Sequence, residues 1–153
     1  MRVECHRLFC SESEEIILAP RVSDIARSLD LPNARFDQLT PADLKRAARS
    51  SLVSSGWASN VHVPGSTLTV NFLRDEAALC LQLGNVARTY ADLLKLQTMF
   101  ITGRIVGGFM AVPVLTASRE LGSNHAQFER LTREVELFRA TVSLPLAVIG
   151  LDD

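Results

Sequence analysis

Two short strand-like runs joined by three charged residues constrain the fold of this chain more than any other feature. Residues 67–72 alternate polar and apolar side chains, as a half-buried β-strand does. Residues 74–76 are charged and suit a turn, and residues 77–83 return as a second strand with its leucines on one face. The segment therefore predicts a β-hairpin, with Cys80 and Gln82 as neighbours on the face opposite the leucines.

Helices and further strands are expected around this hairpin. Thr40, Pro41 and Asp43 form a strong helix start, because threonine caps free amide groups, proline suits the first turn and aspartate favours the positive helix end. The other expected elements are a short strand or helix at 15–19, a brief helix at 22–29, the Thr40 helix running to about 55, a long helix at 86–102, an apolar strand at 105–115, an amphipathic helix capped by Ser123 or Asn124, and a final strand at 144–151. This order predicts an α/β layered fold.

Length and composition favour one domain, spanning residues 1–153. The chain is 47% hydrophobic, which is enough for a single well-packed core at this length. It carries 16 basic and 17 acidic residues, so its net charge of −1 gives no general attraction to phosphate polymers. Any binding of nucleic acid must therefore use a local basic patch.

The three cysteines indicate a reducing compartment. Their odd number argues against a disulfide framework, and Cys5 and His6 with Cys10 lack the paired spacing of a zinc site. The first residues are charged where a signal peptide needs an apolar core, and no segment has the roughly 20 apolar residues of a membrane span. We expect a cytoplasmic protein with no membrane attachment.

A resemblance to a known family rests on the hairpin and the helix after it. The sequences are Val70-Asn71-Phe72, Leu79-Cys80-Leu81-Gln82-Leu83-Gly84-Asn85 and Tyr90-Ala91-Asp92-Leu93-Leu94-Lys95-Leu96-Gln97. Together they resemble type II restriction endonucleases of the BglII-like group. The resemblance implies a restriction-endonuclease-like core with a mixed central sheet flanked by helices on both faces, duplex DNA as partner, Mg²⁺ as cofactor and a homodimer.

The same resemblance implies an Asp on the first hairpin strand and a Glu-x-Gln on the second. Asn71 stands at the Asp position, Cys80 at the Glu position and Gln82 at the Gln position. Mg²⁺ is held by anionic carboxylate oxygens, whereas Asn71 offers a neutral carbonyl and Cys80 a soft thiol. We therefore expect an impaired enzyme without a metal site, in which Mg²⁺ matters only if some activity remains.

Other residues leave alternatives open. Asp92 and Lys95 could form a migrated site on the following helix. Their three-residue spacing also suits a surface ion pair, and the ion pair is the favoured interpretation. Cys80 is more readily an inert core residue than a nucleophile, which would need a base such as His62. The candidate DNA contacts are Asn85 and Arg88, from the resemblance, and Lys45, Arg46 and Arg49, for which a solvated helix face is the favoured interpretation.

Three functions are consistent with the sequence. The first is a catalytically impaired nuclease relative that binds duplex DNA as a homodimer. The second is an active Mg²⁺-dependent endonuclease with a migrated or unconventional site. The third is a protein-interaction module built on a nuclease fold.

Overall fold

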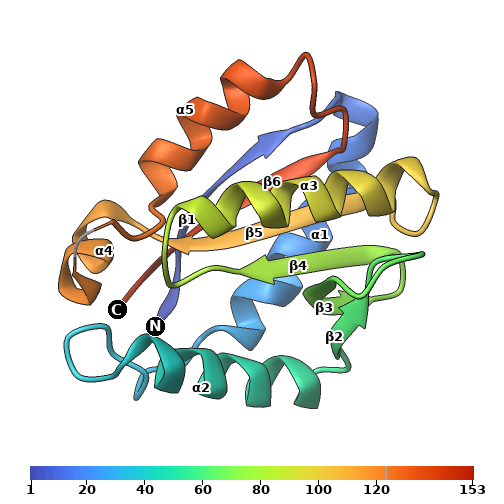
Figure 1. Cartoon of the computed structure of the whole chain (residues 1–153). Helices are drawn as coiled ribbons and strands as arrows, with labels where there is room; N and C mark the ends of the chain where they lie inside the picture. Colours follow the sequence, from blue (N-terminus) through green and yellow to red (C-terminus); the bar gives the residue numbers. More distant parts are fainter. Residues whose placement is uncertain (123) are drawn as a thin grey trace.

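A mixed β-sheet forms the centre of the molecule (Figure 1). The computed structural model describes residues 1–122 and 124–153, and in these residues the sheet has the strand order β1-β6-β5-β4-β3-β2. The strands are β1 (Arg2–Phe9), β2 (Ala58–His62), β3 (Thr69–Arg74), β4 (Ala77–Leu81), β5 (Gly107–Pro113) and β6 (Leu146–Asp152). Strands β4, β5 and β6 are parallel, and the pairs β1–β6, β2–β3 and β3–β4 are antiparallel.

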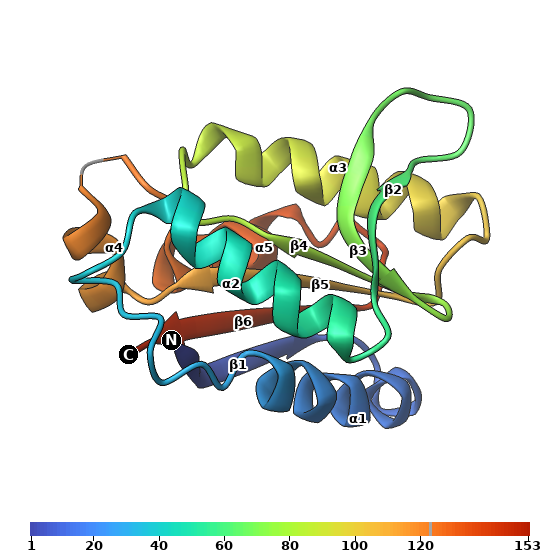
Figure 2. The same cartoon turned by 90° about the horizontal axis from the view of Figure 1, so that it is seen from below.

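Helices cover both faces of this sheet (Figures 1 and 2). The helices are α1 (Glu12–Ser28), α2 (Pro41–Ser54), α3 (Ala87–Ile101), α4 (Leu115–Leu121) and α5 (Phe128–Phe138). One core cluster joins the sheet to α1 and α2, and a second joins it to α3 and α5. The expected α/β architecture, a mixed sheet with helices on both faces, is confirmed.

The central strands β4 and β5 are apolar along their length because both of their faces are buried. Every residue of β4 and β5 is buried, as in a parallel sheet covered by helices on both sides. Strand β1 lies at the edge of the sheet and alternates exposed with half-buried residues along much of its length. Charged side chains such as Arg2 and Glu4 suit an edge strand because they discourage pairing with another chain.

The predicted hairpin is confirmed. Strands β3 and β4 pair with Arg74 opposite Ala77, and Asp75 adopts a positive φ of 54° at the turn between them. Strand β3 begins only at Thr69, so Leu68, expected on the inward face, is 55% exposed. The Thr40 start is also confirmed, because its side chain accepts a hydrogen bond from the Asp43 amide at 3.2 Å.

The first thirty residues are helical where a helix was expected, but the division into two short elements is wrong and the strand before them was not predicted. A strand, β1, precedes a single 17-residue helix, α1, which continues through Pro20. Leu18, Val22 and Ile25 of that helix are buried in the core, and this packing outweighs the disfavoured proline. The short element expected at 15–19 and the helix expected at 22–29 are parts of this one helix.

Two further elements were not expected, and one helix start is corrected. Strand β2 and helix α4 are short, at five and seven residues, and give little periodic signal. Helix α5 begins at Phe128 after Gln127, and not at Asn124, while Ser123 lies outside the described residues. Among the described helices, none is long and apolar enough to cross a membrane.

Candidate functional site

Three polar positions lie in a row across the antiparallel end of the sheet. Asn60 of β2 lies between the pairs Ser59–Phe72 and Val61–Val70, which brings it to the level of Asn71 of β3. Phe72 pairs with Leu79 of β4, which brings the adjacent Asn71 to the level of Cys80. The sequence predicted the neighbourhood of Asn71 and Cys80 but missed Asn60, because β2 itself was missed. The signal was the turn at 63–66, which could have marked a strand before it as well as after it.

Cys80 is a core residue. It is 1% exposed, belongs to the cluster beneath α3 and α5, and pairs in register with Met110 of β5. Burial raises the pKa of the Cys80 thiol well above its usual range, and the nearby Asp92 carboxylate raises it further. This environment strongly favours the protonated thiol, and Cys80 has the character of a packed core residue.

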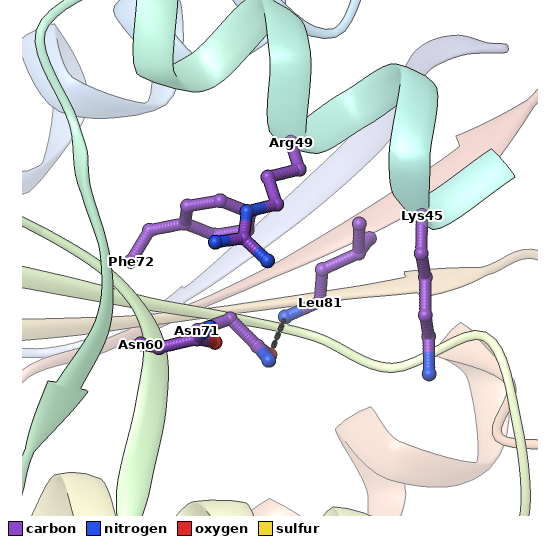
Figure 3. Close-up of a pocket in the computed structure, with 6 residues that line it drawn as sticks. All are labelled: Lys45, Arg49, Asn60, Asn71, Phe72 and Leu81. Carbon is purple, nitrogen blue, oxygen red and sulfur yellow. Dashed lines mark hydrogen bonds between the residues drawn. The ribbon is translucent and has the colours of Figure 1, made fainter. Parts of the chain in front are cut away.

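Asn71 lines a pocket beneath α2, with Lys45 and Arg49 on the opposite wall (Figure 3). The pocket is completed by Asn60, Phe72 and Leu81. The Asn71 Oδ1 atom accepts a hydrogen bond from the Leu81 amide at 2.8 Å. Asn71 thus stabilises the hairpin with its oxygen, and its Nδ2 group is the donor it can offer to a ligand.

Gln82 links the two helices that flank the sheet. Its Nε2 group donates to Asp92 Oδ2 of α3 at 3.2 Å, and its Oε1 atom accepts from the Gly84 amide at 3.1 Å and from Lys45 Nζ of α2 at 3.5 Å. Gln82 is 5% exposed, so these bonds satisfy a buried carboxamide. The Asp92 carboxylate that accepts from Gln82 also acts on the Cys80 thiol, although strand β4 itself ends at Leu81.

Asp92 and Lys95 form the ion pair that their spacing suggested, but the pair is largely buried and not on the surface. Asp92 is 7% exposed, and its Oδ1 atom accepts from Lys95 Nζ at 2.8 Å. Because its Oδ2 atom accepts from Gln82, both carboxylate oxygens are already engaged by positive or polar donors. The pair belongs to the Gln82 network and lies next to the predicted site.

The basic stripe of α2 divides into two groups. Lys45 and Arg49, four residues apart, reach the pocket, whereas Arg46 forms an ion pair with Asp43 at 2.9 Å. Arg49 also donates to Ser59 Oγ at 3.0 Å. The solvated-face interpretation therefore fits Arg46 but is wrong for Lys45, which is half-buried.

Electrostatics make Lys45 unusual. Burial lowers the pKa of the Lys45 ammonium from its ordinary value, and the charge of Arg88 lowers it further, while Asp92 acts in the opposite direction. Arg88 of α3 is therefore close enough to Lys45 of α2 for the two positive charges to repel each other. Asn85 accepts a hydrogen bond from the Ala87 amide at 2.8 Å, so its oxygen stabilises the start of α3.

A divalent cation does not fit these residues. Within residues 1–122 and 124–153, no group of three or more histidine, cysteine or acidic side chains could hold a metal. The Asp92 carboxylate is engaged by Lys95 and Gln82, and the pocket wall carries two cations. Two positive side chains oppose a metal ion instead of holding it.

Comparison with known proteins identifies the family. The family model for restriction endonuclease BglII/BglIII matches residues 9–151. The crystal structure of BglII complexed with a DNA 16-mer is similar with a TM-score of 0.80 and 13% identity, covering 97% of this chain and 78% of that one. Free BglII is similar with a TM-score of 0.68 and 11% identity, covering 97% and 80%. A search of curated proteins gave no match. The family match confirms the resemblance seen in the hairpin, and the chain belongs to the restriction endonuclease BglII/BglIII family.

Proposed function

We propose that this protein binds duplex DNA as a homodimer and does not catalyse efficient Mg²⁺-dependent hydrolysis. The observation that carries the proposal is the charge at the family's catalytic positions. Asn71 is neutral and bonded to the hairpin backbone, and Cys80 is buried as a protonated thiol. Efficient hydrolysis needs carboxylates to hold the metal that polarises the phosphate, and these two positions supply none.

Support for DNA binding comes from the clustering of positive charge. Lys45 and Arg49 of α2 lie over the pocket, and Arg88 at the start of α3 acts on Lys45 electrostatically. The net charge of the chain is only −1, so this local cluster supplies the attraction to phosphates. The similar BglII structure contains DNA, which supports duplex DNA as the partner.

Support for a homodimer comes from the outer surfaces of α3 and α5. These helices lie side by side, since Tyr90 of α3 donates to Glu134 of α5 at 2.7 Å and stacks edge-on against Phe138. They carry large exposed apolar side chains: Leu94 at 61%, Ile101 at 71%, Leu137 at 79% and Phe138 at 40% exposed. Apolar surface of this kind is typical of an interface between protein chains.

A second candidate, an active nuclease with a migrated site, is favoured by the position of Asp92. This carboxylate is buried and bonded to Gln82, at the edge of the family's catalytic positions. Its weakness as a metal site is that Lys95 neutralises it, and among the described residues it belongs to no group of three or more potential metal ligands. Asp92→Asn distinguishes this candidate from the first.

The test combines cleavage with binding. Mixed-sequence duplex DNA is incubated with wild-type protein and the Asp92→Asn variant in Mg²⁺ or Mn²⁺, and duplex affinity is measured in parallel by fluorescence anisotropy. We expect binding that weakens steeply with salt, and no cleavage by either protein. Wild-type cleavage that Asp92→Asn abolishes would establish the migrated site, and absence of DNA binding would favour a protein-interaction module.

The homodimer is tested separately by light scattering coupled to size exclusion. We expect a dimer that a Leu94→Asp, Ile101→Asp double variant converts to monomer. Val53 of α2 is 46% exposed on the other side of the sheet, so Val53→Asp serves as the matched control and leaves the dimer intact. A monomeric wild-type protein at micromolar concentration would contradict the proposal.

We also propose a cytoplasmic location. The free thiols at Cys5, Cys10 and Cys80 are consistent with it, because thiols stay reduced in that compartment.

A further inference from the structure

The pocket beneath α2 has a composition suited to an anion. Two of its lining residues are cations, two are carboxamides and two are apolar: Lys45, Arg49, Asn60, Asn71, Phe72 and Leu81. Of the residues lining it, none is acidic. Figure 3 shows the Arg49 side chain descending from α2 toward Asn71, while Lys45 descends from the same helix past the end of β4, beyond Leu81. A phosphate group combines negative charge with several acceptor oxygens, which matches this set of donors.

Each cation is held where it can reach a ligand. Lys45 and Arg49 are one helical turn apart, and Arg49 is anchored by its bond to Ser59 Oγ at 3.0 Å. Lys45 is half-buried, yet its hydrogen bond to Gln82 Oε1 is long, at 3.5 Å. A partly desolvated ammonium with one weak acceptor gains more from a charged acceptor than a fully hydrated lysine would.

The charge of the pocket equals that of a divalent cation. Lys45 and Arg49 together carry two positive charges, and the neighbouring Asp92 is balanced by Lys95 at 2.8 Å. At the family's catalytic positions, the neutral residues Asn71 and Cys80 replace two anionic ligands. The cationic side chains of Lys45 and Arg49 come from the helix above the same strands. The positive charge of the metal ion is supplied by Lys45 and Arg49, and the negative charge of its ligands is absent.

We infer that this pocket binds one phosphate of the DNA backbone directly, with Lys45, Arg49 and the Asn71 Nδ2 group in place of a metal ion. The inference rests on the proposed DNA binding. It adds which side chains contact the phosphate, and that this contact needs no metal ion. Phosphate contacts of this kind position a duplex without reading its sequence. The pocket binds and orients the phosphate but supplies no group to activate water.

The first arm of the test uses small phosphates on the full chain. Inorganic phosphate and dimethyl phosphate are titrated into isotope-labelled protein in the presence of a chelator, and amide chemical shifts are followed. We expect shifts confined to the neighbourhood of Lys45, Asn71 and Leu81, and their loss in Lys45→Gln. Shifts that require Mg²⁺, or that centre elsewhere on the surface, would overturn the inference.

The second arm measures duplex affinity as a function of salt. We expect Lys45→Gln to weaken binding about tenfold and to reduce the slope of log affinity against log salt by about one. Arg27 of α1 is a matched control, because it is exposed and paired with Asp24 away from the pocket. Arg27→Gln should leave the slope unchanged, and equal thermal melting of both variants excludes a folding effect.

The two arms separate the inference from the proposed function. Phosphate shifts at the pocket without duplex binding would retain the inference for small phosphates and reject DNA as the partner. Duplex binding with a normal salt slope in Lys45→Gln would retain the proposed function and reject the pocket as the phosphate site.

Discussion

Restoring the family's glutamate by Cys80→Glu should destabilise the protein without creating a nuclease. Cys80 is 1% exposed and packed in the cluster beneath α3 and α5. The larger side chain costs about 1–3 kcal/mol in overpacking. A buried carboxyl without a hydrogen-bond partner costs about 1–3 kcal/mol more, even when it is protonated. The free energy of unfolding should therefore fall by about 4 kcal/mol.

This loss is measurable by calorimetry. For a chain of this length, about 2–4 °C of melting temperature is lost per kcal/mol, so Cys80→Glu should melt about 8–16 °C below wild type. The matched control is Cys80→Ala, which deletes one buried atom and should cost about 1 kcal/mol.

The loss should also depend on pH. The pKa of the introduced carboxyl is raised in the folded state, which therefore holds its proton at pH values where the unfolded state has lost it. The variant should recover stability relative to wild type as pH falls through the folded pKa toward the unfolded value, by about 1.4 kcal/mol per pH unit. If the Cys80→Glu variant has the same melting temperature as Cys80→Ala and is stabilised by Mg²⁺, then Cys80 faces the pocket. That result would refute the placement of Cys80 in the core.

Three further predictions follow from the same network. Asp92→Ala should lower the free energy of unfolding in urea by about 3 kcal/mol, because it leaves the Lys95 ammonium and the Gln82 amide without their buried acceptor. Adding Lys95→Met should recover part of that loss, and full additivity would contradict the coupling. Asn71→Asp should fold normally, since a carboxylate can also accept from the Leu81 amide, but its negative charge should weaken duplex affinity several-fold in anisotropy assays; tighter binding would argue against an anion site. Duplex affinity should decline as pH rises through the Lys45 pKa, which lies below its ordinary value of 10.5, because the ammonium is lost. Arg49, Arg88, Asp92 and Lys95 surround this group, and Lys45→Arg should remove the decline, since a guanidinium stays charged.

The sequence predicted those parts of the fold that carry a strong local period. The Thr40 helix start, the hairpin and the buried strand β5 follow from capping, alternation and a continuous apolar run. The N-terminal helix was predicted as two short elements, whereas the packing of Leu18, Val22 and Ile25 joins them into one helix. Tertiary contacts of that kind are not local in the sequence.

The sequence predicted part of the environment of the candidate site residues. The expectation that Cys80 is a core residue agrees with its burial, whereas the spacing of Asn71, Cys80 and Gln82 could not show that Gln82 bonds to Asp92. The contribution of Lys45 depends on how α2 crosses the sheet, a long-range arrangement that helix periodicity leaves open. Asn60 was missed with its strand.

Duplex affinity in chelator, compared with affinity in Mg²⁺, shows whether a metal ion takes part in binding. Because Lys45 and Arg49 supply the positive charge that a metal ion would otherwise supply, affinity should be the same in both buffers once ionic strength is matched. Binding that appears only when Mg²⁺ is added would show that a metal ion still completes the site, and would contradict the account.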